Sequence, residues 1–284
     1  MRAHREVRRT IVVILDGLRP DAVETVNLSH LRELASRGAC SLRATTVAPS
    51  LTNAAVTSLL TGVSPQRHGI RSDRLLLPRS SNGIVGVPEL LARAGYPSSA
   101  FAGDVPRIFR GLAAGIGRRL GLGTLQLCGR TAPEILLAAR STLRTQRRGL
   151  ILFHWRDADA AGHDHGWMSE PYAEAARRLD ATMGKLASLI DLTKDEHTLL
   201  IALADHGGGG TDSNNHESDH ALDRTIPLVL AGKSVLPVVL EPASLLDVPP
   251  TILWAMGVDV PEFHEGRVLR EAFSPVEAPI SAVA

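Results

Sequence analysis

Residues 199–216 read LLIALADHGGGGTDSNNH, and this stretch indicates both the fold and a candidate site. The apolar run 199–204 has the length of a strand buried on both faces, which is typical of a parallel sheet. Asp205 and His206 follow at its carboxyl end, where ligands bind in open α/β sheets. Four glycines then let the backbone turn tightly. Taken alone, the pattern fits a glycine-rich loop with a capping aspartate equally well.

The composition indicates a folded protein with an uneven distribution of charge. The chain has 284 residues, 44% of them hydrophobic, and a formal net charge of +1. Residues 67–148 nevertheless contain fourteen arginines against four acidic residues, and the remainder is acidic. A basic middle suggests an anionic substrate or partner. Solvated helix faces account for most of these arginines at least as well.

The cysteines and the N-terminal segment indicate the cellular compartment of the protein. Cys40 and Cys128 form neither a disulfide framework nor a metal-binding pair. The first apolar run, residues 11–15, is too short for a signal sequence or a membrane span. We therefore expect a cytoplasmic protein that has neither a membrane nor a nucleic acid as its partner.

Strand-like and helix-like segments alternate along the chain. This alternation predicts an α/β fold, with a mostly parallel central sheet and helices on both faces. Without repeats or a linker, residues 1–284 form a single domain, with a lid or insertion at about 71–130. Strands are expected at 10–15, 41–47, 97–103, 149–154, 199–204 and 225–231, and helices at 28–37, 52–60, 86–94, 131–147, 170–190 and 245–256.

Carboxylate and imidazole groups gather after three of these strands, and no thiolate accompanies them. This donor set suits zinc, or manganese, in a site left open for substrate. Six ligands can make two three-ligand sites, and a pair of metals about 4 Å apart forms a clamp for displacement at phosphorus. The six candidates are Asp16, Asp159, His163, Asp205, His206 and His216.

Thr52 supplies the nucleophile that such a clamp would need. It lies at the start of an expected helix, where backbone N–H groups and the helix dipole favour a phosphate. Metal coordination can lower the pKa of a hydroxyl enough to dispense with a general base. A plain helix N-cap also fits this position.

Five ordered motifs carry a resemblance to a known family. They are ILDGLRPDA (14–22), PSLTNAAVTSLLTGVSPQRHGI (49–70), DAAGH (159–163), ADHGGGG with a later histidine (204–216), and DRTIPLVLAG (223–232). Together they resemble the alkaline phosphatase superfamily, and within it the type I phosphodiesterase/nucleotide pyrophosphatase branch, which uses a threonine nucleophile. The resemblance extends from Val12 to about Phe273.

The resemblance implies a role for each candidate residue. One divalent metal ion, held by Asp16, Asp205 and His206, would activate Thr52. A second would be held by Asp159, His163 and His216, and the backbone N–H of Asn53 would assist substrate binding. His216 is preferred because the ligand histidine of similar compact proteins lies eleven residues before the proline of the TIP strand. His220 and His165 remain alternatives.

Two departures from the family bear on the substrate. Asp73 stands where nucleotide-cleaving relatives hold a phosphoryl oxygen with an asparagine, and an ionised acid cannot donate that hydrogen bond. The chain is also shorter than those relatives, which implies a reduced nucleoside-binding cap. The cysteine or serine motif that sulfatases need is absent, so a sulfatase is rejected.

The expected activity is hydrolysis of phosphodiester or pyrophosphate-type bonds through a phosphothreonine intermediate on Thr52. A small anionic phosphate ester, such as a nucleotide, is the expected substrate. A diester is favoured over a monoester because the segments around Thr52 and Asp205 contain no arginine; the nearest cations are Arg67, Arg71 and Arg74. The alternatives are a phosphomonoesterase, phosphonate hydrolase or mutase of the same fold, and a catalytically silent metal-binding protein.

Overall fold

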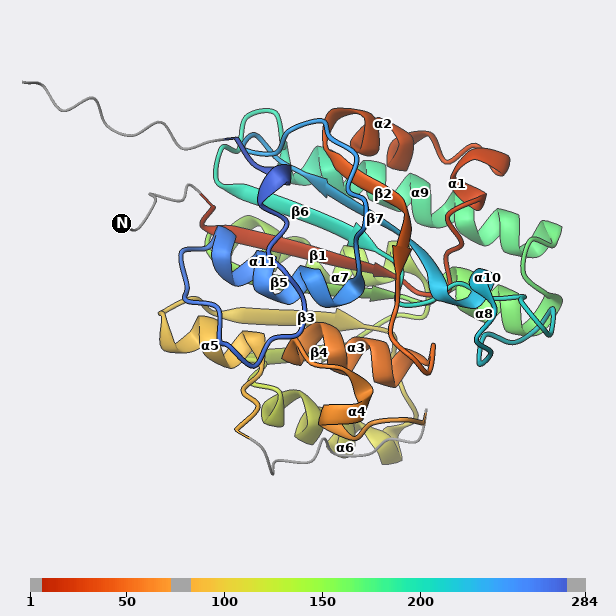
Figure 1. Ribbon diagram of the computed structural model, residues 1–284, viewed down its shortest axis with the longest axis horizontal. Helices are drawn as coiled ribbons and strands as arrows, with labels where there is room; N and C mark the ends of the chain where they lie inside the picture. Colours follow the sequence, from red (N-terminus) through yellow and green to blue (C-terminus); the bar gives the residue numbers. More distant parts are fainter. Residues whose placement is uncertain (1–6, 73–82, 275–284) are drawn as a thin grey trace, which may run out of the picture.

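A seven-stranded sheet forms the centre of the computed structural model, which describes residues 7–72 and 83–274 (Figure 1). The strand order is β2-β7-β6-β1-β5-β3-β4. Only the pairings of β7 with β6 and with β2 are antiparallel, so the sheet is mostly parallel, as predicted. The strands are β1 (Arg9–Leu15), β2 (Ala39–Thr45), β3 (Ser98–Ala102), β4 (Thr124–Leu127), β5 (Gly149–Trp155), β6 (Thr198–Leu203) and β7 (Thr225–Ala231).

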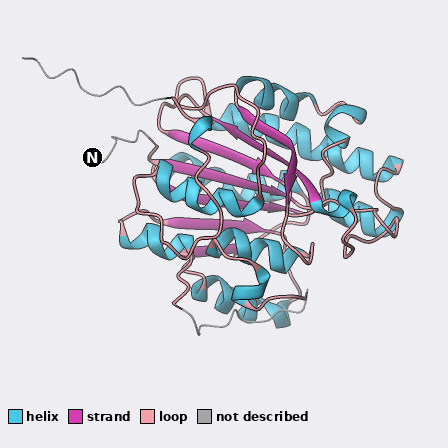
Figure 2. Ribbon diagram, in the orientation of Figure 1, coloured by secondary structure: helices cyan, strands magenta, loops and turns pink. Residues whose placement is uncertain are grey.

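Helices cover both faces of the sheet and give the molecule three layers (Figure 2). On one face lie α2 (Ser29–Arg37), α7 (Ala132–Thr145) and α9 (Glu170–Ile190), and on the other α3 (Thr52–Thr61), α5 (Val87–Arg93) and α11 (Val248–Ala255). α6 (Arg107–Arg119) packs beside the edge strand β4. The short helices are α1 (Ala22–Thr25), α4 (Pro65–His68), α8 (Asp157–His165), α10 (Ala221–Arg224), η1 (Leu245–Asp247) and η2 (Arg270–Ala272).

Burial explains why the middle strands read as continuous apolar runs. Every residue of β1 and of β6 is buried, because helices cover both of their faces. The edge strand β2 instead mixes buried and exposed positions, and β4 contains no fully buried residue. The unbroken apolar runs therefore identify the centre of the sheet.

The expected helices and strands are present, and their ends agree within two residues except at the start of α11, where residues 245–247 form η1 instead. The sequence did not reveal α6, β4 or α8, nor the short helices α1, α4, α10 and η2. Glycines and arginines interrupt the apolar pattern of residues 104–123, and the exit from β5 is too polar to suggest a buried helix. Within the expected insertion, β3 and β4 extend the sheet; a lid function for this segment stays a prediction.

The order of the strands brings distant parts of the chain to one edge. β1 lies between β5 and β6, with Leu15 opposite Trp155 and Ile14 opposite Leu203. Because these three strands are parallel, their carboxyl ends meet. The residues that follow them, which include Asp16 and Asp205, are therefore neighbours.

Arg9 anchors the other end of β1 from a fully buried position. Its guanidinium donates to Thr198 Oγ1 at 2.9 Å, to the Leu143 carbonyl at 3.0 Å and to Asp195 at 2.7 Å. Arg9→Ala should lower the free energy of unfolding by about 2–4 kcal/mol, because it leaves these buried acceptors unpaired. Urea denaturation measures the change.

Arg93→Ala is the matched control for Arg9. It removes an arginine from an exposed pair with Glu89, whose atoms lie 2.6 Å apart. Its cost should stay below about 1 kcal/mol, as is usual for surface ion pairs. If the two variants lose equal stability, the anchoring role of Arg9 is wrong.

Candidate functional site

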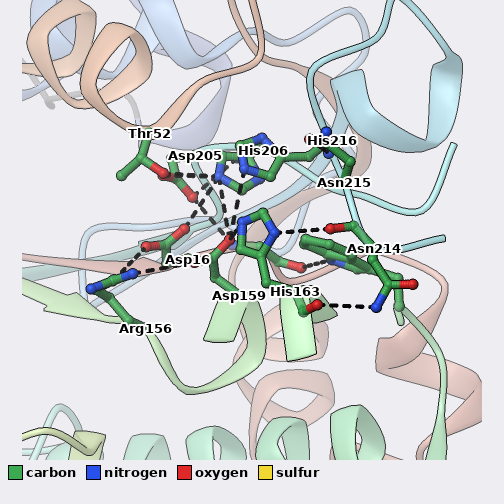
Figure 3. Close-up of polar contacts among 12 residues, drawn as sticks. Asp16, Thr52, Arg156, Asp159, His163, Asp205, His206, Asn214, Asn215 and His216 are labelled. Atoms are coloured by element: carbon green, nitrogen blue, oxygen red, sulfur yellow. Dashed lines mark hydrogen bonds and ion pairs between the residues drawn. The ribbon is translucent and has the colours of Figure 1, made fainter. Parts of the chain in front are cut away.

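The segments that follow β1, β5 and β6 converge at one point (Figure 3). Asp16 follows β1, Asp159 lies on α8 just after β5, and Asp205 and His206 follow β6. All four side chains are buried, with exposed fractions of at most 4%. Three acids are therefore held together in the interior of the protein.

Close backbone contact brings Asp16 and Asp159 together. The Asp159 N–H donates to the Asp16 carbonyl at 3.0 Å. Gly17 has a positive φ of 70°, and a Cβ built there would lie 2.8 Å from Asp159 Cα. A glycine is required here, because any other side chain would separate the two carboxylates.

The three predicted histidine ligands share one arrangement. His163 Nδ1 lies 2.9 Å from the Asn214 carbonyl, His206 Nδ1 2.8 Å from that of Gly207, and His216 Nδ1 2.6 Å from that of Ser50. In each ring Nδ1 is thus placed to donate to a carbonyl while Nε2 faces the carboxylates. Metal-binding histidines are oriented in this way in proteins.

The glycine-rich loop allows this packing. A Cβ on Gly208 would lie 2.1 Å from the ring of Trp167, so the loop follows the indole closely. The loop then returns to place the His216 ring on that of His206, with centroids 3.6 Å apart and nearly parallel planes. Trp167 in turn donates its indole N–H to the Gly17 carbonyl at 2.8 Å.

The carboxylates lack the partners that buried acids need. Oxygen atoms of Asp16, Asp159 and Asp205 are buried and accept no hydrogen bond from a backbone N–H or a hydroxyl of the described residues; the polar atoms nearest to those of Asp16 and Asp159 are histidine Nε2 atoms. Two sets of side chains have donor atoms that converge within 4.8 Å: Asp159, His206 and His216, and Asp16, His154 and Asp205. Buried acids are stable only with compensating positive charge, so these residues fit divalent metal ions.

The pKa values reflect the same shortage of positive charge. Burial, reinforced by repulsion from Asp16, raises the pKa of Asp205 to about 7. Burial alone would lower the pKa of His206, but the neighbouring carboxylates of Asp205 and Asp16 raise it to about 10. A proton on His206 therefore partly balances the acids, and a bound cation would displace that proton.

Thr52 lies at the start of α3, and its hydroxyl faces the acids. Thr52 Oγ1 is 3.1 Å from His206 Nε2. The helix is capped by Leu51, and the Thr52 side chain is no cap, so the plain N-cap interpretation is wrong. Asn53 follows within the first turn. The helix thus presents its positive end, with a hydroxyl, to the buried acids.

All eight predicted site residues lie in or beside this cluster, whereas the two alternative histidines do not take part in it. His165 is exposed at the end of α8. His220 caps α10 by accepting a hydrogen bond from Leu222 N–H at 3.2 Å. His206 Nε2 lies 3.3 Å from Asp16 and 3.9 Å from Asp159, so it is close to an acid of each of the two converging sets.

Sequence reasoning missed two residues of the site. His154 Nε2 lies 2.8 Å from Asp16 Oδ2, and its charge helps to lower the pKa of Asp16 well below the usual range, against the effect of burial. Arg156 lies within 3.7 Å of both Asp16 and Asp159. The sequence pattern places His154 at the end of an apolar strand, and a histidine at a strand end is the signal that could have indicated its role.

Of the cations near α3, Arg67 has other partners and Arg74 falls outside the described residues. Arg67 donates to the Phe263 carbonyl at 2.7 Å and lies 3.4 Å from Glu265. Asp73 and Arg74 lie outside the described residues, so the predicted effect of Asp73 on the substrate stays a prediction.

An apolar cavity of about 190 Å³ adjoins the site. Its wall includes Asn53, the neighbour of Thr52, and His154, which contacts Asp16. The rest is almost wholly apolar and comes from α3, α6 and the residues after it, β1 and strands β3 to β5, with Val56, Leu60, Ala113, Ile116, Phe101 and Leu125 among its members. An uncharged group bound there would lie beside Thr52.

The mostly parallel sheet with helices on both faces is an alkaline phosphatase-like fold. The family described as "Type I phosphodiesterase / nucleotide pyrophosphatase" matches residues 10–85 and 92–245. The chain belongs to this family. The resemblance seen in the sequence motifs is thereby confirmed.

Solved structures agree on the fold. Murine ectonucleotide pyrophosphatase/phosphodiesterase 5, an inactive threonine-to-alanine variant in complex with AMP, superposes with a TM-score of 0.75 and 14% identity, covering 95% of this chain and 100% of that one. An alkaline phosphatase superfamily protein from Vibrio parahaemolyticus superposes with a TM-score of 0.73 and 18% identity. The match covers 93% of this chain and 70% of that one. At these identities the likeness shows the fold alone.

Curated relatives match over a shorter region. The 2,3-bisphosphoglycerate-independent phosphoglycerate mutase of Listeria monocytogenes serotype 4b (strain F2365) is 28% identical over 141 residues, which are 49% of this chain and 26% of that protein. The enzyme of the same name from Natronomonas pharaonis is 27% identical over 146 residues, 50% and 28% of the two chains. The match thus spans about a quarter of these relatives.

Within the described residues, no helix is both long and apolar enough to cross a membrane.

Removing divalent metal should destabilise the protein, because the buried carboxylates then repel one another. A chelator should lower the melting temperature, and added zinc or manganese should restore it. At a hundredfold excess over the dissociation constant, binding stabilises the fold by about 2.7 kcal/mol. Differential scanning fluorimetry measures the shift, and equal melting temperatures with and without metal would contradict a metal site here.

Two aspartate variants distinguish the site from general stability. Asp205→Asn should reduce the metal-dependent shift. Asp180→Asn changes a buried acid away from the site, one that accepts N–H bonds from His30 and Leu31 at 3.1 and 2.8 Å. It should lower stability yet keep the full shift.

Proposed function

We propose that the chain is a metal-dependent phosphoesterase that hydrolyses phosphodiester or pyrophosphate-type bonds through a covalent intermediate on Thr52. The observation that carries this proposal is the position of Thr52 Oγ1. It stands at the positive end of α3, 3.1 Å from His206 and beside three buried carboxylates. Membership of the phosphodiesterase family supports the same conclusion.

The donor set supports zinc, with manganese as a substitute, because all donors are imidazole nitrogens or carboxylate oxygens. The family resemblance assigns Asp16, Asp205 and His206 to the ion nearest Thr52, and Asp159, His163 and His216 to the other. Two bound divalent ions would offset the charge of the phosphoryl group and lower the pKa of the attacking hydroxyl.

The protein's own residues then orient the reaction. α3 holds the Thr52 hydroxyl toward the acids, and its N-terminus favours a negatively charged phosphoryl group. Asn53, which follows Thr52 in the same turn, lines the apolar cavity. The cavity would exclude water from the organic part of the substrate and fix its direction.

The apolar cavity favours an ester with an uncharged ring or chain. Its walls are aliphatic apart from Phe101, Phe153 and a few polar residues. The murine neighbour was solved in complex with AMP, which supports a nucleotide as one candidate for such an ester. The phosphoglycerate mutase relatives support a second candidate, transfer of the phosphoryl group from Thr52 to an alcohol instead of water.

Thr52→Ala should retain its metal but reduce turnover by at least about 1,000-fold, or about 4 kcal/mol, because no other hydroxyl replaces the nucleophile. Hydrolysis of aryl phosphate esters measures the loss, and mass spectrometry of the quenched parent should find phosphate on Thr52. Thr61→Ala is the control. This buried threonine lies at the far end of α3, and its hydroxyl donates a hydrogen bond to the Thr57 carbonyl at 2.7 Å. Turnover of Thr52→Ala within tenfold of the parent would mean that water attacks phosphorus directly.

Filling the apolar cavity should select against large esters. Val56→Phe adds a ring on the α3 wall, so kcat/KM for an ester with an aryl group at the non-leaving oxygen should fall about tenfold, while the methyl ester is nearly unaffected. Leu137→Phe, at a position 64% exposed, provides the control. An equal effect on both esters would contradict a substrate-binding role for the cavity.

A further inference from the structure

Trp167 lies where the segments that carry the proposed metal ligands meet. It follows α8 and is buried, and its backbone N–H donates to the Ser213 carbonyl at 2.8 Å. Its indole can only donate a hydrogen bond, so the sequence gave no reason to place it in the site. The first ion, nearest Thr52, has the proposed ligands Asp16, Asp205 and His206; the second has Asp159, His163 and His216.

The indole N–H of Trp167 holds the turn that follows Asp16. It donates to the Gly17 carbonyl at 2.8 Å, and the Tyr172 hydroxyl donates to the same carbonyl at 3.1 Å. The Gly17 N–H in turn donates to Asp205 Oδ1 at 3.3 Å. The turn is therefore bonded on both sides of Gly17, and it keeps two ligands of the first ion in a fixed relation.

The ring of Trp167 packs against two ligands of the second ion. Its centroid lies 5.2 Å from that of His163 and 5.8 Å from that of His216, with interplanar angles of 80° and 65°. Edge-to-face contacts of this kind are favourable and depend on direction. Since backbone carbonyls already hold the Nδ1 atoms of both histidines, the indole adds a second contact that limits the rotation of each ring.

Two glycines allow the indole to come so close to the chain. A Cβ on Gly162 would lie 2.6 Å from the ring, and a Cβ on Gly208 would lie 2.1 Å from it. Gly162 directly precedes His163, and Gly208 lies two residues after His206. A larger residue at either position would push the indole away, because protein interiors leave no spare volume for it. One side chain thus packs on backbone next to ligands of both ions.

We propose that Trp167 is a positioning residue that holds the ligands of the two metal ions in register with each other. The indole N–H fixes the turn beside Asp16, and the ring orients His163 and His216. The inference rests on the metal-binding part of the proposed function and adds a residue that is itself no ligand. Because different parts of one side chain make the two contacts, substitutions can remove them separately.

The test titrates the metal-free protein with zinc by calorimetry, against a competing chelator, and resolves two dissociation constants. Trp167→Phe keeps an aromatic ring but loses the N–H that bonds to Gly17. It should weaken binding of the first ion about tenfold, as is usual for residues that support metal ligands, and binding of the second less than about threefold. Trp167→Leu also removes the aromatic ring, so both ions should bind about tenfold more weakly or worse.

Three further variants assign the constants and control for stability. Asp205→Asn should weaken the first ion and His163→Ala the second, which shows which constant belongs to which site. Trp254→Phe is the matched control, because Trp254 lies on α11 and packs against Phe273, with ring centroids 5.3 Å apart. It should lower the melting temperature of the metal-free protein and leave both zinc affinities unchanged.

Fluorescence gives a second readout that a general loss of stability would not change. The chain contains three tryptophans, and the indole of Trp167 lies edge-on to two ligands of the second ion. Zinc should therefore change the emission of the parent and of Trp254→Phe. Most of this change should be lost in Trp167→Phe, and an undiminished change there would contradict the contact with the ligands.

The remaining outcomes separate this inference from the proposed function. Unchanged affinities in both Trp167 variants, or equal weakening of the two ions in Trp167→Phe, would overturn the role of Trp167 and leave the proposed function standing. If Trp167→Leu does not fold, Trp167→Phe decides alone. A parent that binds no zinc would reject both the metal site and this inference. A parent that binds both ions but cleaves no ester would reject the proposed hydrolysis without affecting the test, because its readout is metal binding.

Discussion

Three buried carboxylates on neighbouring segments impose the main constraint on this structure. The side chains of Asp16, Asp159 and Asp205 are at most 4% exposed, and some of their oxygens accept no hydrogen bond from a backbone N–H or a hydroxyl of the described residues. Charges buried in this way are costly unless cations compensate them. The glycine at position 17, the sharp exit from β5 and the loop after β6 all serve to hold the acids close together despite their repulsion.

The histidines show how the surrounding structure prepares the site. A carbonyl from a different loop fixes Nδ1 of His163 and of His216, and the next residue's carbonyl does so for His206. Each Nε2 atom therefore already faces the acids in the absence of a ligand. Because the rings are oriented in advance, little conformational entropy is lost when a cation binds. The same rigidity extends to Thr52, because α3 begins at that residue and packs on the sheet through its buried face.

Two kinds of surface then meet at Thr52. On one side are the buried acids and the positive end of α3, which suit divalent ions and a charged phosphoryl group; on the other is the apolar cavity between α3 and α6, which suits an uncharged substituent. His154 borders both, since it contacts Asp16 and lines the cavity. Ligand sites commonly combine apolar walls with a few polar or charged groups, and the fold provides both at one sheet edge.

The sequence by itself determined the central strands, the acids at their ends and the threonine at a helix start. Those features are local, because apolar runs and the residues just after them can be read without knowing their neighbours. Only the tertiary structure decided that His216 rather than His220 turns toward the acids, that His154 and Arg156 join them, and that a cavity lies behind Asn53. These depend on distances between segments far apart in the chain, which strand order and loop packing set, and on side-chain directions that no local pattern specifies.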